Sequence, residues 1–595
     1  MLPNDIENFG SILLTEVHNT NPYTSVNLLK ATYTASIDFI FGKYIIINAK
    51  NQTIPENAIT ISNSLYDIDF FPNRMTCRTA QRAIEIIENH QLENYFKNFE
   101  LPNSTKRFIR DSDLEFDNFN WENKKIANNN EQEQAIRNIV NQTAFPSPYV
   151  LFGPPGTGKT TTIIEAIVQI IKLKPNARIL LTSNTNSNCD NLGIRLLEYV
   201  SCNKILRIYS SRYDEHSEKI PVALKQISNY RLETLCKCKS LFCKEKHPFD
   251  NPSYEEFYTA RVVIATLCSS GRFVTGGIKS DHFDYIFIDE AATNAEPYTL
   301  IPISGLGSRF EQITANIVLC GDHKQLGPII ADHYNIILGF RTPMMKRLLM
   351  MKKYNCYTHE EVERNSIYVT KLLKNFRSNE RILEFSNQNF YNGALQSVAS
   401  KKIQNFAVGW SALNNPSLPI LFHASLSPCY QVGTSLINDG EIALVNYYVQ
   451  MLLSNGVNGK RVSQKDIGII STYRAQRENM VLLFKSCYSD VEIGTIDSFQ
   501  GCEKKIIILS TVRSNTKTFG FLRSSKRLNV ALTRAQSLLI IIGNPITLKL
   551  NEIWKKFILH CEYYRTFVNH QLCVPAYINN TLFQDIKEPI RLHGR

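Results

Sequence analysis

Eight consecutive residues carry the strongest chemical signal in the chain: Gly153-Pro154-Pro155-Gly156-Thr157-Gly158-Lys159-Thr160. They fit the pattern of a glycine, four residues and then Gly-Lys-Ser/Thr, in which glycines let consecutive backbone N–H groups turn toward one phosphate. At this spacing the Lys159 ammonium can reach the β- and γ-phosphates of a nucleotide, and the Thr160 hydroxyl can hold Mg²⁺. A strand-like run at 149–152 precedes the loop and a helix-like run at 161–168 follows it, so the positive end of a helix dipole would face the phosphates.

A pair of acids follows the apolar run 285–288. Asp289 can hold Mg²⁺ through a water, and Glu290 can orient and deprotonate an attacking water. The alternative is a strand that merely leaves the core, but Lys159 upstream in the same predicted domain favours the catalytic interpretation.

Three further side chains are candidates for contacts with the γ-phosphate. Gln325 lies in the Gly- and Pro-containing segment 321–328, after a third apolar run, where its amide could touch the phosphate or the lytic water. Arg377 and Arg534 are the cations that could stabilise charge in the transition state. On spacing alone, a surface or ion-paired arginine is the commoner explanation for each.

Composition indicates a multidomain globular protein. The chain has 595 residues, of which 43% are hydrophobic and 20% charged, and its net charge of 66 − 54 = +12 is a mild bias toward polyanions that also fits an ordinary basic enzyme. The 14 cysteines have no small-domain spacing pattern, which favours a reducing compartment. No signal peptide and no bilayer-spanning apolar run are apparent, so we expect a soluble intracellular protein without a membrane partner.

The order of apolar and polar segments predicts the domains. Residues 1–100 form a β-rich accessory domain with alternation at 35–40 and 44–47 and a helix at 79–90, and the Asn-rich residues 101–127 form a linker. Doubly buried strands alternating with helices predict two α/β domains with parallel sheets. These domains are 128–345, with an insertion at 201–258, and 346–560, and a tail occupies 561–595. The predicted strands are 149–152, 178–182, 262–265, 285–288 and 317–320 in the first domain and 467–471, 506–510 and 538–542 in the second.

Six segments in this order resemble the core of superfamily-1 helicases of the class that includes the nonsense-mediated-decay helicase: Gly153–Thr160, Asp289–Ala292, Gly321–Pro328, Asn375–Arg377, Gly494–Glu503 and Val530–Ala535. The resemblance spans about residues 50 to 560. Longer strings resemble the Armitage-type RNA helicases of RNA silencing: Leu151–Pro155 with Glu165–Ile167, Phe287–Glu290 with Glu296-Pro297 and Leu300–Pro302, and Phe70–Arg74 with Arg78 and Ala83. Members of this group usually carry a longer N-terminal region, and this chain begins within what resembles their β-barrel insertion.

The resemblance implies two tandem RecA-like domains that bind ATP with Mg²⁺. It implies that Gln132 reads adenine, that Phe376 packs near the base, and that Arg377 and Arg534 touch the γ-phosphate. It also implies that Gln500 and Glu503 link the nucleotide to the second domain. By contrast, Glu165 needs no catalytic role and is expected to be a surface charge on its helix.

The same resemblance implies 5′-to-3′ movement on single-stranded RNA across both domains. The matching RNA-contact positions are Ser183, Asn184, Thr266, Thr495 and Ser498, although such residues after strands are more often loop and helix-cap residues. Implied partners are Argonaute- or Piwi-type silencing proteins or mRNA-decay factors, in the cytoplasm or its ribonucleoprotein granules. The alternatives are a DNA helicase with the same core and a hydrolysis-weak RNA-binding scaffold.

The predicted insertion contains Cys236, Cys238, Cys243 and His247. Three thiols and an imidazole could form a tetrahedral zinc site. The spacing is not the usual Cys-x₂-Cys repeat, so a loop with reduced cysteines is the alternative.

Overall fold

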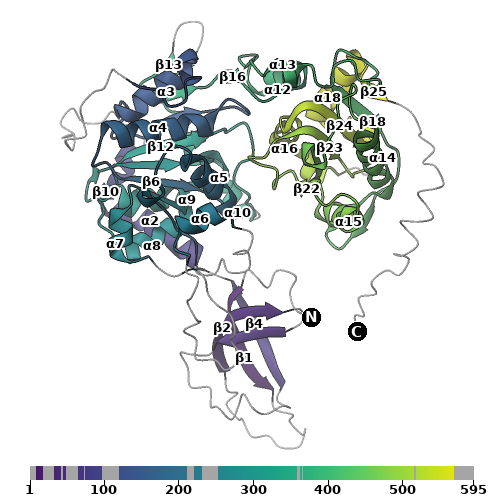
Figure 1. The fold of residues 1–595 in the computed structure, drawn as a ribbon. Coiled ribbons are helices and arrows are strands. Elements are labelled where there is room, and N and C mark those ends of the chain that lie inside the picture. The colour runs from purple at the N-terminus through teal and green to yellow at the C-terminus, as the bar shows by residue number, and fades with distance from the viewer. Residues whose placement is uncertain are drawn as a thin grey trace, which may run out of the picture. The chain divides into compact units, whose positions relative to one another are not determined.

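The computed structural model describes residues 9–17, 32–41, 44–48, 65–72, 74–96, 119–210, 220–230, 249, 252–330, 332–357, 362–364, 366–514 and 518–568. The chain divides into two units, Met1–Ile86 and Ile87–Arg595, which are described separately (Figure 1). In the described part of the chain, no helix combines the length and apolar character needed to cross a bilayer.

The first unit contains a four-stranded antiparallel sheet with the strand order β3-β2-β1-β4. Its strands are β1 (Phe9–Val17), β2 (Thr32–Phe41), β3 (Tyr44–Asn48) and β4 (Leu65–Pro72). Strands β2 and β3 contain the two segments whose alternation predicted strands. Helix α2 (Met75–Asn89) follows, close to the predicted 79–90.

The second unit contains a seven-stranded parallel sheet that carries the phosphate loop (Figure 1). Its order is β15-β5-β12-β9-β6-β8-β7, and its central strands are buried along their whole length, as expected for a sheet covered by helices on both faces. The strands are β5 (Tyr149–Phe152), β6 (Ile179–Ser183), β7 (Ile205–Arg207), β8 (Val262–Thr266), β9 (Tyr285–Ile288), β12 (Asn316–Gly321) and β15 (Val369–Lys371). The longer helices are α3 (Asn130–Val140), α4 (Lys159–Leu173), α5 (Asn186–Leu196), α8 (Leu267–Thr275) and α9 (Glu296–Leu306).

A six-stranded parallel sheet follows, with the order β22-β21-β23-β24-β18-β25. Separate buried clusters pack around it. The strands are β18 (Ile420–Ala424), β21 (Ile467–Ser471), β22 (Glu492–Thr495), β23 (Lys504–Ser510), β24 (Ala535–Gly543) and β25 (Phe567–Val568). The longer helices are α12 (Glu380–Phe390), α14 (Asp439–Asn455), α15 (Arg474–Phe484), α16 (Ser525–Leu532) and α18 (Glu552–Tyr563). The prediction of two α/β domains with parallel sheets is therefore confirmed.

Short elements connect these sheets and helices. The short helices are η2 (Leu92–Tyr95), η3 (Ile126–Asn128), η4 (Cys202–Lys204), α6 (Val222–Gln226), α7 (Tyr254–Thr259), η6 (Ala291–Thr293), α10 (His333–Ile337), α11 (Met344–Leu348), η7 (Lys352–Tyr354), α13 (Lys401–Gln404), η8 (Gln464–Asp466), η9 (Gly520–Arg523) and α17 (Pro545–Leu548). The short strands are β10 (Ser308–Arg309), β11 (Gln312–Ile313), β13 (Asn355–Tyr357), β14 (Val362–Arg364), β16 (Lys374–Asn375), β17 (Gln396–Ser397), β19 (Tyr430–Val432) and β20 (Ser435–Ile437).

Both α/β domains extend beyond their predicted C-terminal boundaries. Strand β15 pairs with β5 in the first sheet, although it lies after residue 345. Strand β25 pairs with β18 in the second sheet, although it lies in the predicted tail. These edge strands are only two or three residues long, so their apolar content is too small to predict them.

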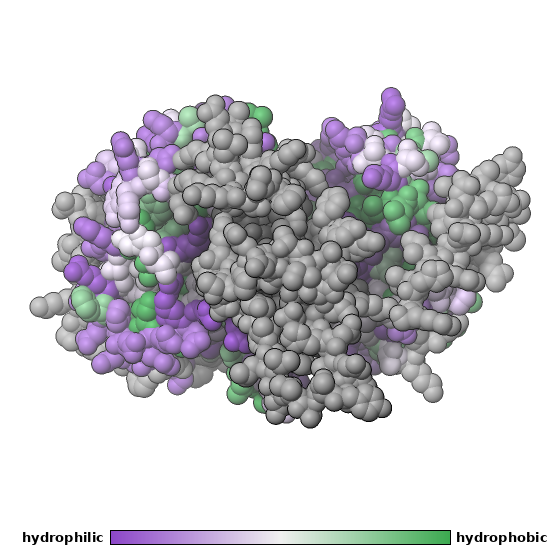
Figure 2. Space-filling model, turned by 90° about the horizontal axis from the view of Figure 1, so that it is seen from below, coloured by the Kyte–Doolittle hydropathy of each residue, from purple (hydrophilic) through white to green (hydrophobic). Residues whose placement is uncertain are grey.

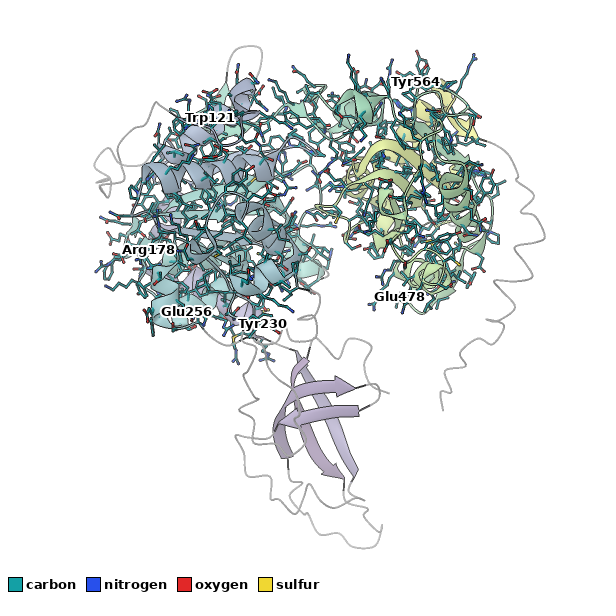
Figure 3. The ribbon with its side chains drawn as sticks, viewed as in Figure 1. Trp121, Arg178, Tyr230, Glu256, Glu478 and Tyr564 are labelled. Carbon is teal, nitrogen blue, oxygen red and sulfur yellow. The ribbon has the colours of Figure 1, made fainter. Side chains whose placement is uncertain are left out.

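Glu165 on α4 is buried, so the expectation of a surface charge was wrong. The side chain is only 2% exposed, and its carboxylate accepts hydrogen bonds from the backbone N–H groups of Glu122 and Asn123 at 2.9 and 3.0 Å. Gln169 donates both to Glu165 and to the Asn120 carbonyl. Helix α4 therefore anchors the segment 120–123, whose Trp121 (Figure 3) stacks on Phe119 at a ring distance of 5.2 Å.

Candidate nucleotide-binding site

The phosphate loop lies between β5 and α4, as predicted. Gly156 and Gly158 have φ angles of +68° and +83°, a region that side chains rarely adopt. A Cβ atom on Gly156 would also lie 2.4 Å from the Cβ of Arg377. The Lys159 ammonium donates to the Gly153 carbonyl at 2.8 Å, which keeps the positive charge within the loop.

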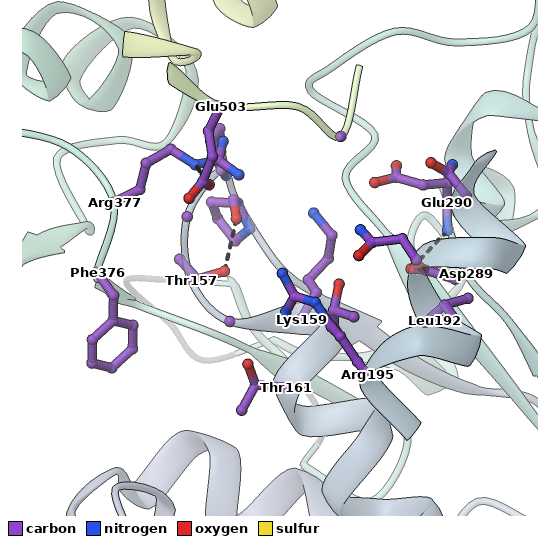
Figure 4. Close-up of a pocket in the computed structure, with 18 of the residues that line it drawn as sticks. Thr157, Lys159, Thr161, Leu192, Arg195, Asp289, Glu290, Phe376, Arg377 and Glu503 are labelled. Atoms are coloured by element: carbon purple, nitrogen blue, oxygen red, sulfur yellow. Dashed lines mark hydrogen bonds and ion pairs between the residues drawn. The ribbon is translucent and has the colours of Figure 1, made fainter. Parts of the chain in front are cut away.

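A cavity of about 580 Å³ opens beside this loop (Figure 4). Its size and mixed polar and apolar lining suit a nucleotide-sized ligand. Predicted site residues in the lining are Gln132, Pro154, Pro155, Gly156, Thr157, Gly158, Lys159, Thr160, Asp289, Glu290, Gln325, Phe376, Arg377, Glu503 and Arg534. Asn123, Lys125, Ile126, Thr161, Asn188, Asn191, Leu192, Arg195, Gly501 and Cys502 complete it.

The predicted acidic pair follows β9 and faces the loop lysine. Asp289 is 6% exposed and its carboxylate accepts from the Glu290 backbone N–H at 2.9 Å. Burial and then the Glu290 charge raise the pKa of Asp289 to about 6, and the Lys159 charge opposes them. A cation would favour the ionised form, and the Thr160 hydroxyl and Asp289 carboxylate are oxygen donors of the kind that Mg²⁺ prefers. These residues therefore fit a magnesium ion. Glu290 itself has a φ of +53°, a strained conformation for a residue with a side chain.

Arg534, at the end of α16, reaches this site from the second α/β domain. Its side chain is 2% exposed, and its guanidinium donates to the Gln325 side-chain oxygen at 2.6 Å and to the Cys502 carbonyl at 3.2 Å. Burial and then the charge of Arg377 lower the pKa of Arg534 to about 10, so it stays charged near neutral pH. The interpretation of Arg534 as a mere surface arginine does not fit this placement.

Arg377 lies at the other side of the cavity, in the segment that joins the two sheets. It forms an ion pair with Glu503 and donates to the Thr533 carbonyl at 3.2 Å. The preceding residues hold this segment to the phosphate loop, because the Asn375 amide donates to the Pro155 carbonyl at 2.6 Å and the Phe376 N–H donates to the Gly156 carbonyl at 2.8 Å. Figure 4 shows Phe376 and Arg377 on the same side of Lys159.

Gln132 and Gln500 occupy two further positions around the site. Gln132 on α3 is 3% exposed and donates to the Thr162 hydroxyl at 2.9 Å, so it holds the start of α4, and its contact with adenine stays a prediction. The Gln500 amide donates to the Glu290 carboxylate at 3.4 Å. Gln500 therefore links the second domain to the catalytic acid.

The predicted RNA contacts lie outside the nucleotide cavity. Ser183 is fully buried at the end of β6, and its hydroxyl has no hydrogen-bond partner among the described residues, whereas Asn184 beside it is exposed. Thr266 caps α8 by accepting from the Ser269 N–H at 3.3 Å. Thr495 and Ser498 hydrogen-bond each other across one turn. The cap and turn roles weighed from the sequence are thus present, and the RNA contacts stay predictions.

The four candidate zinc ligands Cys236, Cys238, Cys243 and His247 lie outside the described residues. Within the described ranges, no group of three or more His, Cys, Asp or Glu side chains is arranged to hold a metal ion.

Sequence reasoning missed a buried polar network between the two α/β domains. The Tyr391 hydroxyl, after α12, donates to the Asp322 carboxylate at 2.7 Å, and the Asn529 amide of α16 donates to the Tyr391 oxygen at 2.8 Å. Asn529 also donates to the Lys324 carbonyl at 3.1 Å. No spacing rule pairs residues so far apart in the chain. Asp322 and Lys324 lie in the segment Gly321–Pro328 that the sequence had singled out, but nothing in that segment pointed to Tyr391 or Asn529.

Comparison with known proteins identifies the family of this chain. Two models described as "AAA domain" match residues 127–255 with 252–333 and residues 345–546. "Putative helicase mov-10-B.1" of Danio rerio is 35% identical over 86% of this chain and 50% of its own length. "Probable RNA helicase armi" of Drosophila melanogaster is 30% identical over 88% and 43%, respectively. The chain belongs to the superfamily-1 helicases. "DNA polymerase alpha-associated DNA helicase A" of Saccharomyces cerevisiae is also 31% identical over 70% of this chain and 65% of its own length. This superfamily-1 helicase chain spans about half the length of the first two relatives.

Proposed function

We propose that the protein is an ATP-dependent RNA helicase or translocase that moves 5′ to 3′ on single-stranded RNA and remodels duplexes or RNA–protein complexes. One observation supports this most. The Arg534 guanidinium of the second α/β domain shares a single cavity with Lys159 and Glu290 of the first. A site built from two domains can couple nucleotide hydrolysis to their relative movement.

Each side chain has a role in this proposal. Glu290 takes a proton from the attacking water, and the Arg377 and Arg534 guanidinium groups stabilise the negative charge of the transition state. Thr160 and Asp289 would hold Mg²⁺, which would neutralise phosphate charge. Gln325 is oriented by its hydrogen bonds to Asp322 and Arg534 at 2.8 and 2.6 Å.

The two domains would move relative to each other because each contributes residues to the same site. Because the arginines belong to the second domain and its connecting segment, the γ-phosphate favours a closed arrangement of the two domains. Hydrolysis removes these contacts and permits reopening. Alternating closure and opening would move the protein along a strand whose backbone crosses both domains, with sequence-tolerant and salt-sensitive binding.

RNA is proposed as the nucleic acid along which the protein moves, because relatives are named RNA helicases. Single-stranded DNA is the second candidate, because similar identity extends to a protein named a DNA helicase. Argonaute- or Piwi-type silencing proteins or mRNA-decay factors as partners, and a location in the cytoplasm or its ribonucleoprotein granules, are proposed on the family resemblance alone.

The proposal is tested by ATP hydrolysis in the presence of single-stranded RNA or DNA of matched sequence, and by unwinding of matched duplexes with 5′ overhangs. We expect stronger stimulation by RNA and RNA unwinding. Equal or better activity on DNA would favour the DNA helicase, and negligible turnover with either strand would favour the scaffold.

Glu290→Gln supplies the variant that separates binding from turnover. It should still bind ATP but lose turnover by about three or more orders of magnitude, as removal of catalytic groups commonly does. The matched control is Glu478→Gln, an exposed glutamate on α15 (Figure 3) whose ion pair among the described residues is with Arg474 on its own helix. This control should retain activity.

A further inference from the structure

A segment of the first α/β domain that contains α10 begins at Gly327 and returns at Arg341. A Cβ atom on Gly327 would lie 4.0 Å from the Arg341 carbonyl oxygen and 3.4 Å from the Lys526 ammonium of α16. The two ends of the segment therefore meet beside the second domain. Between them the segment exposes unusually large apolar side chains: Ile329 (75% exposed), Tyr334 (76%), Ile337 (68%), Leu338 (72%) and Phe340 (37%).

Four cations gather where this segment closes, and we name them the junction cluster: Lys324, Arg341, Lys346 and Lys526. The first three belong to the first domain, whose sheet includes the later strand β15, and Lys526 belongs to the second domain. Burial and then the charges of the other three lower the pKa of Lys526, with Asp322 as the one opposing acid. None of the four forms an ion pair with any other described residue, so their charge is largely uncompensated.

Asp322 cannot neutralise the junction cluster. Its carboxylate already accepts hydrogen bonds from the Lys324 N–H, the Gln325 amide and the Tyr391 hydroxyl. Burial also raises the pKa of Asp322. The described residues on the face shown in Figure 2 are largely hydrophilic. The segment that ends at Arg341 of the junction cluster, by contrast, exposes the aromatic rings of Tyr334 and Phe340.

The placement of Lys526 is unfavourable unless an anion is nearby. Lys526 and Arg527 lie in the first turn of α16 (Ser525–Leu532), which contains no acidic residue. The helix dipole is positive at this end and disfavours cations. Arg527 also donates to the Asp497 carboxylate at 3.2 Å, which joins this helix end to the turn containing the predicted RNA contacts Thr495 and Ser498.

We propose that the junction cluster binds the phosphate backbone of single-stranded RNA at the boundary between the two domains and thereby couples RNA binding to domain closure. The inference rests on the proposed function and names a site that the motifs did not predict. Without RNA, like charges on the two domains repel each other. Phosphates between them remove that repulsion and attract both sides. The exposed rings of Tyr334 and Phe340 supply faces on which bases can stack.

Closure matters because the same elements carry catalytic groups. Lys324 precedes Gln325, and α16, whose first turn contains Lys526, ends two residues before Arg534. Gln325 and Arg534 meet at 2.6 Å across the two domains. RNA bound at the junction cluster would hold these two side chains together and so accelerate hydrolysis.

The test compares the intact chain with Lys526→Gln, Arg341→Gln and the double variant Lys324→Gln/Lys526→Gln. The matched control is Lys555→Gln, an exposed lysine on α18. RNA affinity is measured between 50 and 200 mM salt with a fluorescent single-stranded RNA. Each phosphate-binding cation contributes about 0.7 to the slope of log affinity against log salt for single strands. We expect slopes shallower by about 0.7 for single variants and about 1.4 for the double variant, and no change for the control. We also expect the RNA concentration for half-maximal ATPase to rise by about tenfold in the double variant.

Unchanged slopes in all three variants, with RNA-stimulated ATPase intact in the unsubstituted chain, would overturn this inference and leave the proposed function standing. No binding or stimulation by RNA in the unsubstituted chain would overturn both. Equal slope changes on RNA and DNA would support the cluster as a backbone site, whereas slope changes on DNA without any on RNA would overturn the RNA assignment. Because Arg341 is exposed in a loop, its variant tests the cluster even if substitutions on α16 disturb folding. Competition by polyglutamate as effective as by RNA of equal charge would point to an acidic protein partner and overturn the RNA assignment.

Discussion

Tyr391→Phe removes one hydroxyl from the interface between the two α/β domains and keeps the aromatic ring. The Tyr391 hydroxyl donates to the Asp322 carboxylate at 2.7 Å and accepts from the Asn529 amide at 2.8 Å. Asp322 in turn orients Gln325, which contacts Arg534. The substitution therefore weakens the hydrogen-bonded connection between the domains without touching the nucleotide cavity, whose lining does not include Tyr391.

The magnitude follows from the charged partner. A hydrogen bond to a charged group contributes about 1.5–3 kcal/mol, and Asn529 also loses an acceptor, although it keeps the Lys324 carbonyl. If closure precedes hydrolysis, this loss lowers the population of the closed state by about 10- to 150-fold. We expect kcat for RNA-stimulated ATP hydrolysis to fall by about tenfold or more, with a smaller change in the KM for ATP.

The assay is steady-state ATPase with saturating RNA, and the control is Tyr563→Phe, whose ring is 80% exposed. A double-mutant cycle with Asn529→Ala adds a readout that a general loss of stability would not give. Two substitutions in one network should cost less together than the sum of their separate effects. A kcat within twofold of the unsubstituted chain for Tyr391→Phe would refute the reasoning.

Two other predictions concern buried carboxylates. Burial raises the pKa of Glu441 to about 7 from an ordinary 4.5, so the folded second domain retains a proton that the unfolded chain loses as pH rises from about 4.5 to 7. This difference destabilises the domain by up to about 3 kcal/mol above pH 7. Glu441→Gln should remove that pH dependence, which is checked by measuring the thermal unfolding midpoint at pH 5 and pH 8. If the midpoint falls equally from pH 5 to pH 8 in the variant and the unsubstituted chain, the prediction is contradicted. Glu165→Gln replaces one of the two carboxylate oxygens that accept from the backbone N–H groups of residues 122 and 123 with an amide donor. Because Asn123 lines the nucleotide cavity, the KM for ATP should rise by about tenfold with little change in kcat. A fall in kcat at unchanged KM would show that the 120–123 segment does not support the nucleotide cavity.

Patterns of apolar residues and short motif spacings made much of the fold predictable. Strands buried on both faces contain nearly continuous apolar residues, so β5, β9 and β21 were predicted with their observed boundaries. The phosphate loop and the acidic pair were predictable for a similar reason, because their chemistry depends on short-range spacing. The side chains that fell outside such rules were the buried Glu165, whose helix face could not be assigned, and the edge strands β15 and β25.

What the sequence could not supply is which residues meet across the two α/β domains. Arg534 and Gln325 are 209 positions apart, and Tyr391 and Asp322 are 69 apart, so no local period relates them. Their partners are nevertheless consistent with one physical requirement. A buried guanidinium and a buried carboxylate are each costly to desolvate unless hydrogen-bonded. Each has partners in its own domain and gains one more across the two domains, Gln325 for Arg534 and Tyr391 for Asp322. The approach of the two domains also brings the unpaired cations Lys324 and Lys526 into proximity, which opposes closure. A balance between these effects would make closure depend on added negative charge, which under our proposals the triphosphate and the RNA backbone would supply at two different places.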